Sequence, residues 1–156
     1  MRVEDISGVL IILKKITKTS EKKYQDWVLG DVMQRIGYYF LNKDKSALLV
    51  AEEGGQIIGY SIAGIIREGE KGELWFLDNI NPNEAFNWVY LQYVAVDPDW
   101  HGKGIGSKLL AGLAKIARKK KLKGIYTGTR GKTKEFYLKN GYQEDKIFLL
   151  KRVKPL

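Results

Sequence analysis

Three glycines at alternate positions could let a ligand approach the backbone closely. Gly102, Gly104 and Gly106 follow an apolar run that ends at Val96, and they precede a segment with helical spacing. A turn of this kind presents successive backbone N–H groups at the start of a helix, where the helix dipole also favours negative charge. The chemistry that this arrangement predicts is the binding of a phosphate or diphosphate group.

Two common phosphate-binding motifs do not describe this turn. The dinucleotide fingerprint G-x-G-x-x-G requires a glycine at position 107, where the sequence has Ser107. The tripeptide Gly131-Lys-Thr133 looks like the end of a Walker motif, but Tyr126 occupies the position of the required upstream glycine. The glycine-rich turn therefore predicts a phosphate site of another kind.

A second candidate group for chemistry is Tyr137. It lies in the run Phe136-Tyr-Leu-Lys-Asn-Gly-Tyr142, which is typical of a short helix that ends at a left-handed Asn-Gly cap. The unperturbed pKa of a phenol is about 10, so the group is protonated at neutral pH and can give its proton to a leaving group. Taken alone, a tyrosine on a short helix is more often a core residue.

Periodicity predicts the elements that would position these residues. The predicted strands are 8–16, 46–52, 57–66, 88–96, 125–129 and 147–153. The predicted helices are 20–41, a segment that begins near Ile105, and 132–139. This order is typical of an α/β protein with a mixed sheet and packed helices.

Glycine and proline predict where several of these elements end. Gly54-Gly55 predicts a hairpin between the second and third strands, and Asp97-Pro98 ends the strand 88–96. Gly30 predicts a break in the first helix. Residues 73–80 are predicted as a further strand segment.

Length and composition restrict the class of protein. The 156 residues carry no repeat or linker and predict one domain over residues 1–156. The absence of cysteine and the single His101 exclude a disulfide framework, a cysteine nucleophile and a histidine-rich metal site, so no metal is expected. The charged first residues lack a signal-peptide pattern and no apolar run is long enough to span a bilayer, which predicts a cytoplasmic protein without a membrane partner.

The net charge of +9 leaves two interpretations open. In one, the basic residues form an ordinary solvated surface or bind an anionic ligand. In the other, the chain is a nucleic-acid or ribosome-binding protein. The tract from Arg118 to Lys123 is the evidence for nucleic acid, but lysines at the end of a helix also complement its dipole. The aromatic residues show no RNA-binding arrangement, so nucleic acid is the less favoured partner.

The glycine-rich turn resembles motif A of the GNAT superfamily of N-acetyltransferases, [Q/R]-x-x-G-x-[G/A], which reads here His101-Gly-Lys-Gly104-Ile-Gly106. The run from Phe136 to Tyr142 resembles the second signature of that family, and the resemblance covers about Ile57 to Val153. It implies an α/β fold whose central, mostly antiparallel sheet is splayed between the fourth and fifth strands and has helices on both faces. It also implies that acetyl-CoA is the co-substrate and that Tyr137 is the general acid for the departing thiolate.

The resemblance also implies a set of binding residues for acetyl-CoA. They are Val94, Ala95, Val96, His101, Gly102, Lys103, Gly104, Ile105, Gly106, Ser107 and Arg130. His101 stands where the family usually has glutamine or arginine, so a weaker phosphate contact is expected. Several relatives carry a glutamate base on the central strand, but the matching positions here are Tyr90 and Gln92, and neither is a good base.

The missing base bears on the acceptor, which the resemblance implies to be a primary amine: a peptide N-terminus, a lysine or a small amine. Deprotonating an α-amine with a pKa near 8 costs roughly 1.4 kcal/mol at pH 7, whereas a lysine amine costs roughly 4.6 kcal/mol. The sequence thus favours an α-amine. A protein of the same fold that binds acetyl-CoA without turnover is the alternative, and the chain is expected to be a monomer or a homodimer.

Overall fold

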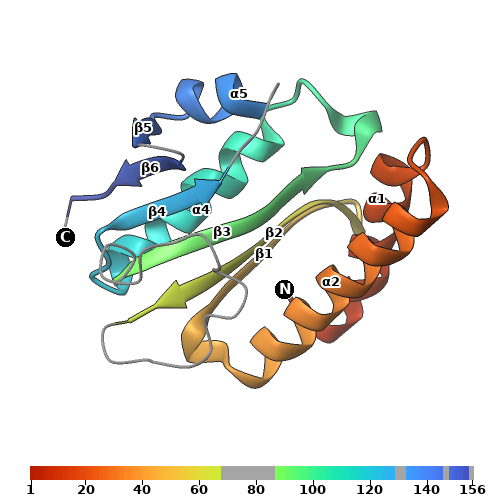
Figure 1. The fold of residues 1–156 in the computed structure, drawn as a ribbon, viewed down its shortest axis with the longest axis horizontal. Helices are drawn as coiled ribbons and strands as arrows, with labels where there is room; N and C mark the ends of the chain where they lie inside the picture. The colour runs from red at the N-terminus through yellow and green to blue at the C-terminus, as the bar shows by residue number, and fades with distance from the viewer. Residues whose placement is uncertain (68–86, 129–132, 146–147, 155–156) are drawn as a thin grey trace.

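The computed structural model describes residues 1–67, 87–128, 133–145 and 148–154, and it shows one sheet with helices on both faces (Figure 1). The strands are β1 (Ser46–Glu53), β2 (Gln56–Ile66), β3 (Trp88–Val96), β4 (Gly124–Gly128), β5 (Gln143–Asp145) and β6 (Phe148–Arg152). The helices are α1 (Ile6–Thr17), α2 (Lys22–Leu41), α4 (Ile105–Lys119) and α5 (Lys134–Lys139), with short 3-10 turns at Val3–Asp5, Lys43–Lys45 and Pro98–Trp100. No helix in these ranges is both long and apolar enough to cross a lipid bilayer.

The strand order is β1-β2-β3-β4-β6-β5, and every neighbouring pair is antiparallel except β3 and β4, which are parallel. Helices α1 and α2 cover one face of the sheet, where Val9, Ile12 and Ile36 pack in one buried cluster with Ile62 of β2. Helices α4 and α5 cover the other face (Figure 1). The predicted fold class is therefore confirmed.

The prediction of a strand at 8–16 is wrong, because these residues form helix α1. Val9, Ile12 and Leu13 are its buried residues, which is the i, i+3, i+4 spacing of a helix face. A Cβ atom at Gly8 would lie 2.6 Å from the Cβ of Ile57, so glycine lets α1 pack directly on β2. The run of aliphatic residues by itself suits either a strand or a helix, and the contact of Gly8 with Ile57 favours the helix.

The other predicted elements are found with small shifts of their ends. Helix α2 is continuous through Gly30, so the predicted break there is wrong. Strand β5 was not predicted, because three residues carry too little periodicity. The predicted strand segment at 73–80 lies outside the described residues.

The sheet opens between β3 and β4. The two strands pair over three residues only, the last being Tyr90 with Tyr126, and then separate. Beyond that point the Thr127 hydroxyl donates a hydrogen bond of 3.0 Å to the Leu91 carbonyl. Residues 8–16, the first predicted strand, belong to helix α1, so the fourth and fifth predicted strands correspond to β3 and β4. The predicted splay between these two strands is confirmed.

Strand β3 contains a β-bulge at the same level. Ile62 of β2 pairs with Tyr93, whereas its neighbour Ala63 pairs with Leu91, so Gln92 is the additional residue. The additional residue shifts the alternation of backbone directions by one position. After the bulge, residues that would have turned their N–H and C=O groups toward one neighbouring strand turn them toward the other. The bulge therefore determines which amides of β3 face the opening.

Candidate active site

A cavity of about 840 Å³ lies beside the end of β3, beyond the point where β3 and β4 separate. Its walls come from the end of β3, the glycine-rich turn, the beginning of α4 and the region of α5. The lining residues are Val94, Ala95, Val96, Trp100, His101, Gly102, Gly104, Ile105, Gly106, Ser107, Thr133, Phe136 and Tyr137. The fold thus brings the turn and Tyr137 to one cavity, although they are more than thirty positions apart in the sequence.

The backbone of β3 beyond the bulge turns alternately toward β2 and toward the opening. The amide of Asp97 donates to Ile58 of β2, which places Asp97 on the β2 side. By alternation, Val94 and Val96 turn their backbone groups toward the opening. Val96 indeed accepts a hydrogen bond there from His101. These two residues present main-chain donors and acceptors along one wall of the cavity.

The three glycines of the turn are needed for two different reasons. Gly102 and Gly104 have φ angles of +78° and +74°, a left-handed conformation that favours glycine. Gly104 is the N-cap residue of α4, whose dipole is positive at this end. Gly106 is needed for space, because a Cβ atom there would lie 3.0 Å from the Cζ of Phe136.

The turn is fixed to α1 through a buried carboxylate. Asp97 is fully buried, and its carboxylate accepts hydrogen bonds of 2.7 Å from Lys15 and 3.1 Å from the Asp99 amide. Lys15 also lies 2.8 Å from Asp99. The hydrogen bond from Lys15 holds the pKa of Asp97 below its usual value, although burial acts in the opposite direction.

His101 is exposed at the mouth of the cavity, and its Nε2 lies 3.0 Å from the Val96 carbonyl oxygen. A carbonyl oxygen can only accept, so Nε2 carries the hydrogen. The Nε2 hydrogen is therefore used by the Val96 carbonyl and is not free to donate to a phosphate. This contact gives a structural reason for the weaker phosphate contact expected from the sequence.

Among the predicted binding residues that the structure describes, Lys103 does not line the cavity. The Nζ atom of Lys103 lies 4.1 Å from the ring centroid of Trp100, so the lysine packs over an aromatic ring beside the turn. Arg130 lies outside the described residues.

Tyr137 of α5 is buried and lines the cavity. Burial raises the pKa of Tyr137, and a hydrogen-bonding interaction with the Thr127 side chain partly opposes that rise. The net upward shift keeps the phenol protonated at neutral pH. Thr127 links β4 to the Leu91 carbonyl and interacts with Tyr137. Sequence analysis missed this threonine, because no local pattern marks it.

Tyr90 and Gln92 lie away from the cavity wall. The side chain of Gln92 turns to the face covered by α2, where its Oε1 accepts a hydrogen bond of 3.1 Å from Tyr39. Its Nε2 is buried and has no hydrogen-bond partner among the described residues. Burial raises the pKa of Tyr90, so its phenolate is disfavoured as a base.

A carboxylate that the sequence analysis did not consider lies on this second face. Asp31 of α2 accepts hydrogen bonds of 2.6 Å from the Tyr93 hydroxyl and 2.7 Å from Arg35 Nε. Burial alone would raise the pKa of Asp31, but the hydrogen bonds from Arg35 and Tyr93 hold it below the usual value. Asp31 is thus a paired anion, which makes it a poor proton acceptor.

Comparisons with known proteins agree with this geometry. Residues 44–144 match the family model described as an acetyltransferase (GNAT) domain. A search of curated sequences gives no match. The structure is similar to a ribosomal-protein-alanine N-acetyltransferase from Brucella melitensis, with 22% identity over 98% of this chain and 97% of the other and a TM-score of 0.71.

Two further structures that resemble this chain contain the cofactor. A GNAT family acetyltransferase from Brucella melitensis, in complex with acetyl-CoA, has 22% identity over 99% of this chain and 86% of the other, with a TM-score of 0.65. A PaiA N-acetyltransferase from Thermoplasma acidophilum, in complex with coenzyme A, has 18% identity over 99% and 95% of the two chains, with a TM-score of 0.69.

The family match extends over about two thirds of the sequence, so the chain belongs to the GNAT acetyltransferases. It is an acyltransferase that uses acetyl-CoA as its co-substrate, as the two sequence signatures predicted.

Proposed function

We propose that this protein moves an acetyl group from acetyl-CoA to a primary amine, and that the reaction takes place in the cavity between β3 and β4. The observation that carries the proposal is the meeting of three features in that cavity. They are the glycine-rich turn, the open backbone edge of β3, and the protonated Tyr137.

Each feature corresponds to one part of the co-substrate. Residues Gly102 to Ser107 would hold the diphosphate with main-chain amides at the positive end of α4. The pantetheine arm would lie along β3 and pair with the backbone of Val94 and Val96. An amide of this edge would also donate a hydrogen bond to the thioester carbonyl, where negative charge develops during attack.

The chemical step would be direct attack of a neutral amine on the thioester carbon. The C–S bond then breaks, and Tyr137 gives its proton to the departing thiolate. The attacking nitrogen loses a proton as the amide forms, and that proton passes to solvent water or returns to the Tyr137 phenolate. The raised pKa of Tyr137 supports this role, because the phenol stays protonated at the pH of the reaction. The route needs no covalent enzyme intermediate, which fits a chain without cysteine.

The acceptor in this proposal is an α-amine, such as the N-terminus of a peptide. No carboxylate is among the described residues that line the cavity, and Asp31 on the other face is a paired anion. An α-amine depends least on a base, since its pKa lies close to neutrality.

The direct test is a thiol-release assay with acetyl-CoA and three kinds of acceptor. These are peptides with a free α-amine and no lysine, N-terminally blocked peptides with one lysine, and polyamines. We expect the free α-amine peptides to have the highest kcat/KM. Faster acetylation of the blocked lysine peptides or of the polyamines would show that the proposed acceptor is wrong.

The same assay separates an enzyme from a protein that only binds acetyl-CoA. Acetyl-CoA binding measured by calorimetry, without turnover on any of these acceptors, would support the binding protein. The absence of acetyl-CoA binding at millimolar concentrations would contradict the whole assignment.

A further inference from the structure

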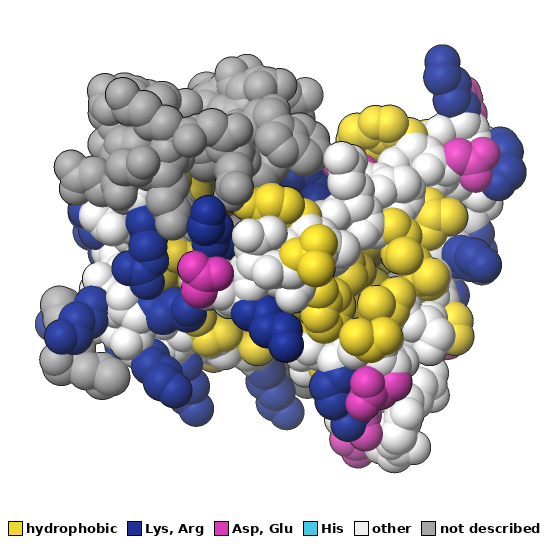
Figure 2. All heavy atoms as spheres, turned by 90° about the horizontal axis from the view of Figure 1, so that it is seen from below, with side chains coloured by type: hydrophobic (Ala, Val, Ile, Leu, Met, Phe, Trp, Pro, Cys, Tyr) yellow, Lys and Arg dark blue, Asp and Glu magenta, His cyan; other side chains and the backbone are white. Residues whose placement is uncertain are grey.

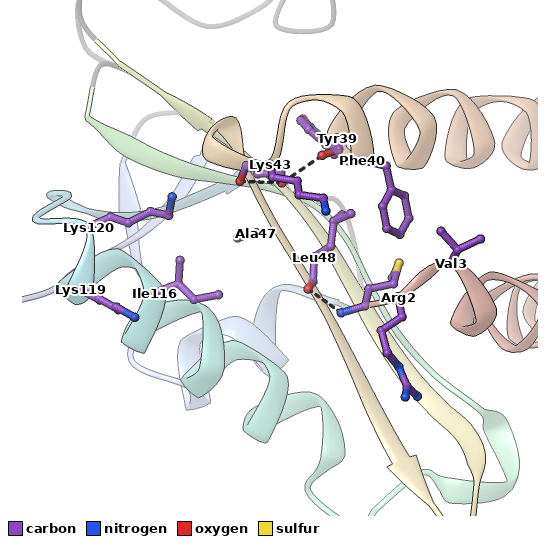
Figure 3. Close-up of a pocket in the computed structure, with 12 residues that line it drawn as sticks. Arg2, Val3, Tyr39, Phe40, Lys43, Ala47, Leu48, Ile116, Lys119 and Lys120 are labelled. Atoms are coloured by element: carbon purple, nitrogen blue, oxygen red, sulfur yellow. Dashed lines mark hydrogen bonds between the residues drawn. The ribbon is translucent and has the colours of Figure 1, made fainter.

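A second cavity of about 830 Å³ lies at the opposite end of α4, beside the outer edge of β1. It is bounded by the end of α2, the turn after it, the last turns of α4 and the first residues of the chain (Figure 3). Its lining residues are Met1, Arg2, Val3, Tyr39, Phe40, Lys43, Ser46, Ala47, Leu48, Ile116, Lys119 and Lys120. We call it the β1-edge groove.

The β1-edge groove is separate from the acetyl-CoA cavity. The first cavity extends along α4 to Ser107, whereas this groove contains Ile116, nine residues further along the helix. At a rise of 1.5 Å per residue the two sites are about 14 Å apart along α4. Among the described residues, none lines both. A ligand in the groove would therefore leave the reaction site open.

The floor of the groove is apolar. Ala47 is buried there, and Leu48, Ile116 and Phe40 are half-buried, so each keeps part of its apolar surface in contact with solvent. Figure 2, which shows the molecule from the side of β1, has hydrophobic side chains next to a group of Lys and Arg side chains. An apolar floor with a cationic border suits a ligand that has both apolar and acidic groups.

The border of the groove carries positive charge with little compensation. Lys43, Lys119 and Lys120 form no ion pair with a carboxylate in the described part of the chain, and no acidic residue is among the lining residues. Lys120 donates a hydrogen bond of 3.2 Å to the Asp44 carbonyl, which holds its side chain over the groove without neutralising it.

Arg2 does not add to this charge. It pairs with Asp5 at 3.0 Å and lies 3.5 Å from Glu52, so its guanidinium is already balanced by carboxylates. The positive charge is therefore concentrated at the Lys43 and Lys119 end of the groove and not along its whole length.

The backbone of β1 faces the groove because β1 is the edge strand of the sheet. The Leu48 carbonyl turns outward and accepts a hydrogen bond of 3.3 Å from the Met1 nitrogen (Figure 3). Backbone directions alternate along a strand, so Ser46 also turns outward. An extended chain can pair with such an edge through its own main chain, which is the usual mode of strand addition.

We propose that the β1-edge groove binds an extended segment of a partner protein in which aliphatic residues alternate with aspartate or glutamate. The main chain of the segment pairs with the outer edge of β1. Because side chains alternate between the two faces of a strand, its aliphatic side chains lie on the α2 side against Phe40 and Leu48, and its carboxylates lie on the α4 side, where they meet Lys119 and Lys120.

Two other occupants fit the observations less well. A second copy of this chain would bring the same three lysines to the same place, and like charges would oppose that contact. A nucleic acid would meet the lysines, but its phosphates gain nothing from an aliphatic floor. The basic tract that ends α4 therefore supports an acidic peptide in preference to RNA.

The test uses a fluorescein-labelled ten-residue peptide that alternates valine or leucine with glutamate, measured by fluorescence anisotropy on the full chain. We expect saturable binding that the double variant Lys119→Glu, Lys120→Glu weakens by roughly tenfold. The double variant Lys14→Glu, Lys18→Glu is the matched control with the same change of charge, since both lysines are exposed and lie outside the groove. Thermal unfolding of both variants checks that each is folded, and acetyl-CoA turnover should be unchanged in both.

A second peptide, N-methylated at alternate main-chain amides, tests strand addition and should bind much more weakly. Equal binding of the two peptides would contradict pairing with β1. Equal weakening by Lys14→Glu, Lys18→Glu would show a nonspecific charge effect and overturn the site. A ten-nucleotide single-stranded RNA that competes better than the peptide, or a stable homodimer that the double variant dissociates, would assign the groove to one of the other occupants.

Discussion

The Nζ atom of Lys15 lies 2.7 Å from the Oδ2 atom of Asp97, although the two residues are 82 positions apart. Asp97 is fully buried at the end of β3, directly before the glycine-rich turn. The ion pair therefore joins helix α1 to the segment that presents the backbone amides of the turn. A buried carboxylate that loses its partner is strongly destabilising, so this contact should affect both folding and co-substrate binding.

The ion pair makes the stability dependent on pH in a defined direction. The pKa of Asp97 in the folded chain is below the ordinary value of 3.8, so its stabilisation is fully present above that value. It is lost as the pH falls through the lower pKa of the folded state. Lys15→Met leaves the Asp97 carboxylate without its cation, so we expect a lower Tm at neutral pH. The Tm of this variant should then fall less on acidification than the Tm of the unchanged chain. Thermal unfolding between about pH 6 and about pH 2.5 measures both effects.

Lys14→Met is the control for that experiment, because Lys14 lies on the same helix and is exposed. The turn should also hold acetyl-CoA less well in Lys15→Met, with a higher KM and a smaller change in kcat. Equal Tm values for the two variants across this pH range would refute the role of the ion pair.

Replacing Tyr137 with phenylalanine removes the proposed proton donor and keeps the aromatic packing. We expect kcat to decrease by roughly 10²–10⁴-fold, as is typical when a general acid is lost, while acetyl-CoA affinity measured by calorimetry stays the same. Because burial raises the pKa of Tyr137 above 10.0, the activity of the unchanged enzyme should not decline through loss of this proton below that pH.

Tyr142→Phe is the matched control for the tyrosine. Its ring centroid is 5.2 Å from that of Tyr137, but Tyr142 is not among the residues that line the cavity. If both substitutions reduce kcat equally, the effect belongs to packing and not to proton transfer.

His101→Gln restores the residue type usual in the family and introduces a side-chain donor at the mouth of the cavity. In the present structure the donor nitrogen of His101 is used by the Val96 carbonyl. One added hydrogen bond to a phosphate is worth about 1 kcal/mol, so KM for acetyl-CoA should decrease about fivefold with kcat nearly unchanged. Steady-state kinetics at several acetyl-CoA concentrations give both values. An increase in KM would mean that His101 binds the phosphate better than glutamine does.

Two glycine-to-alanine substitutions should have opposite effects on stability. Gly104 has a φ of +74°, so alanine there strains the backbone by about 1 kcal/mol and should also raise KM for acetyl-CoA. Gly30 lies in the middle of α2 with no atom within 4 Å of a new Cβ, and alanine there should stabilise the chain by about 0.5–1 kcal/mol. Urea unfolding measures both, and a stabilising effect of Gly104→Ala would contradict the left-handed turn.

Features that depend on a few neighbouring residues could be predicted from the amino-acid sequence. The hairpin at Gly54-Gly55, the apolar strand β3, the glycine-rich turn and the amphipathic helix α4 each follow from local turn chemistry and periodicity. For the same reason the position of the expected phosphate site was predictable from the spacing of Gly102, Gly104 and Gly106.

Features that depend on contacts between distant segments could not be predicted in this way, because they arise only in the folded chain. The apolar run in α1 suits a strand or a helix equally, and its packing through Gly8 on Ile57 makes it a helix. The bulge at Gln92, the Thr127 link, the Lys15–Asp97 pair and the β1-edge groove likewise exist only once separate segments meet. Local periodicity reports which face of an element is apolar, whereas register, ion pairing and the shape of cavities are set by the partner that each face finds.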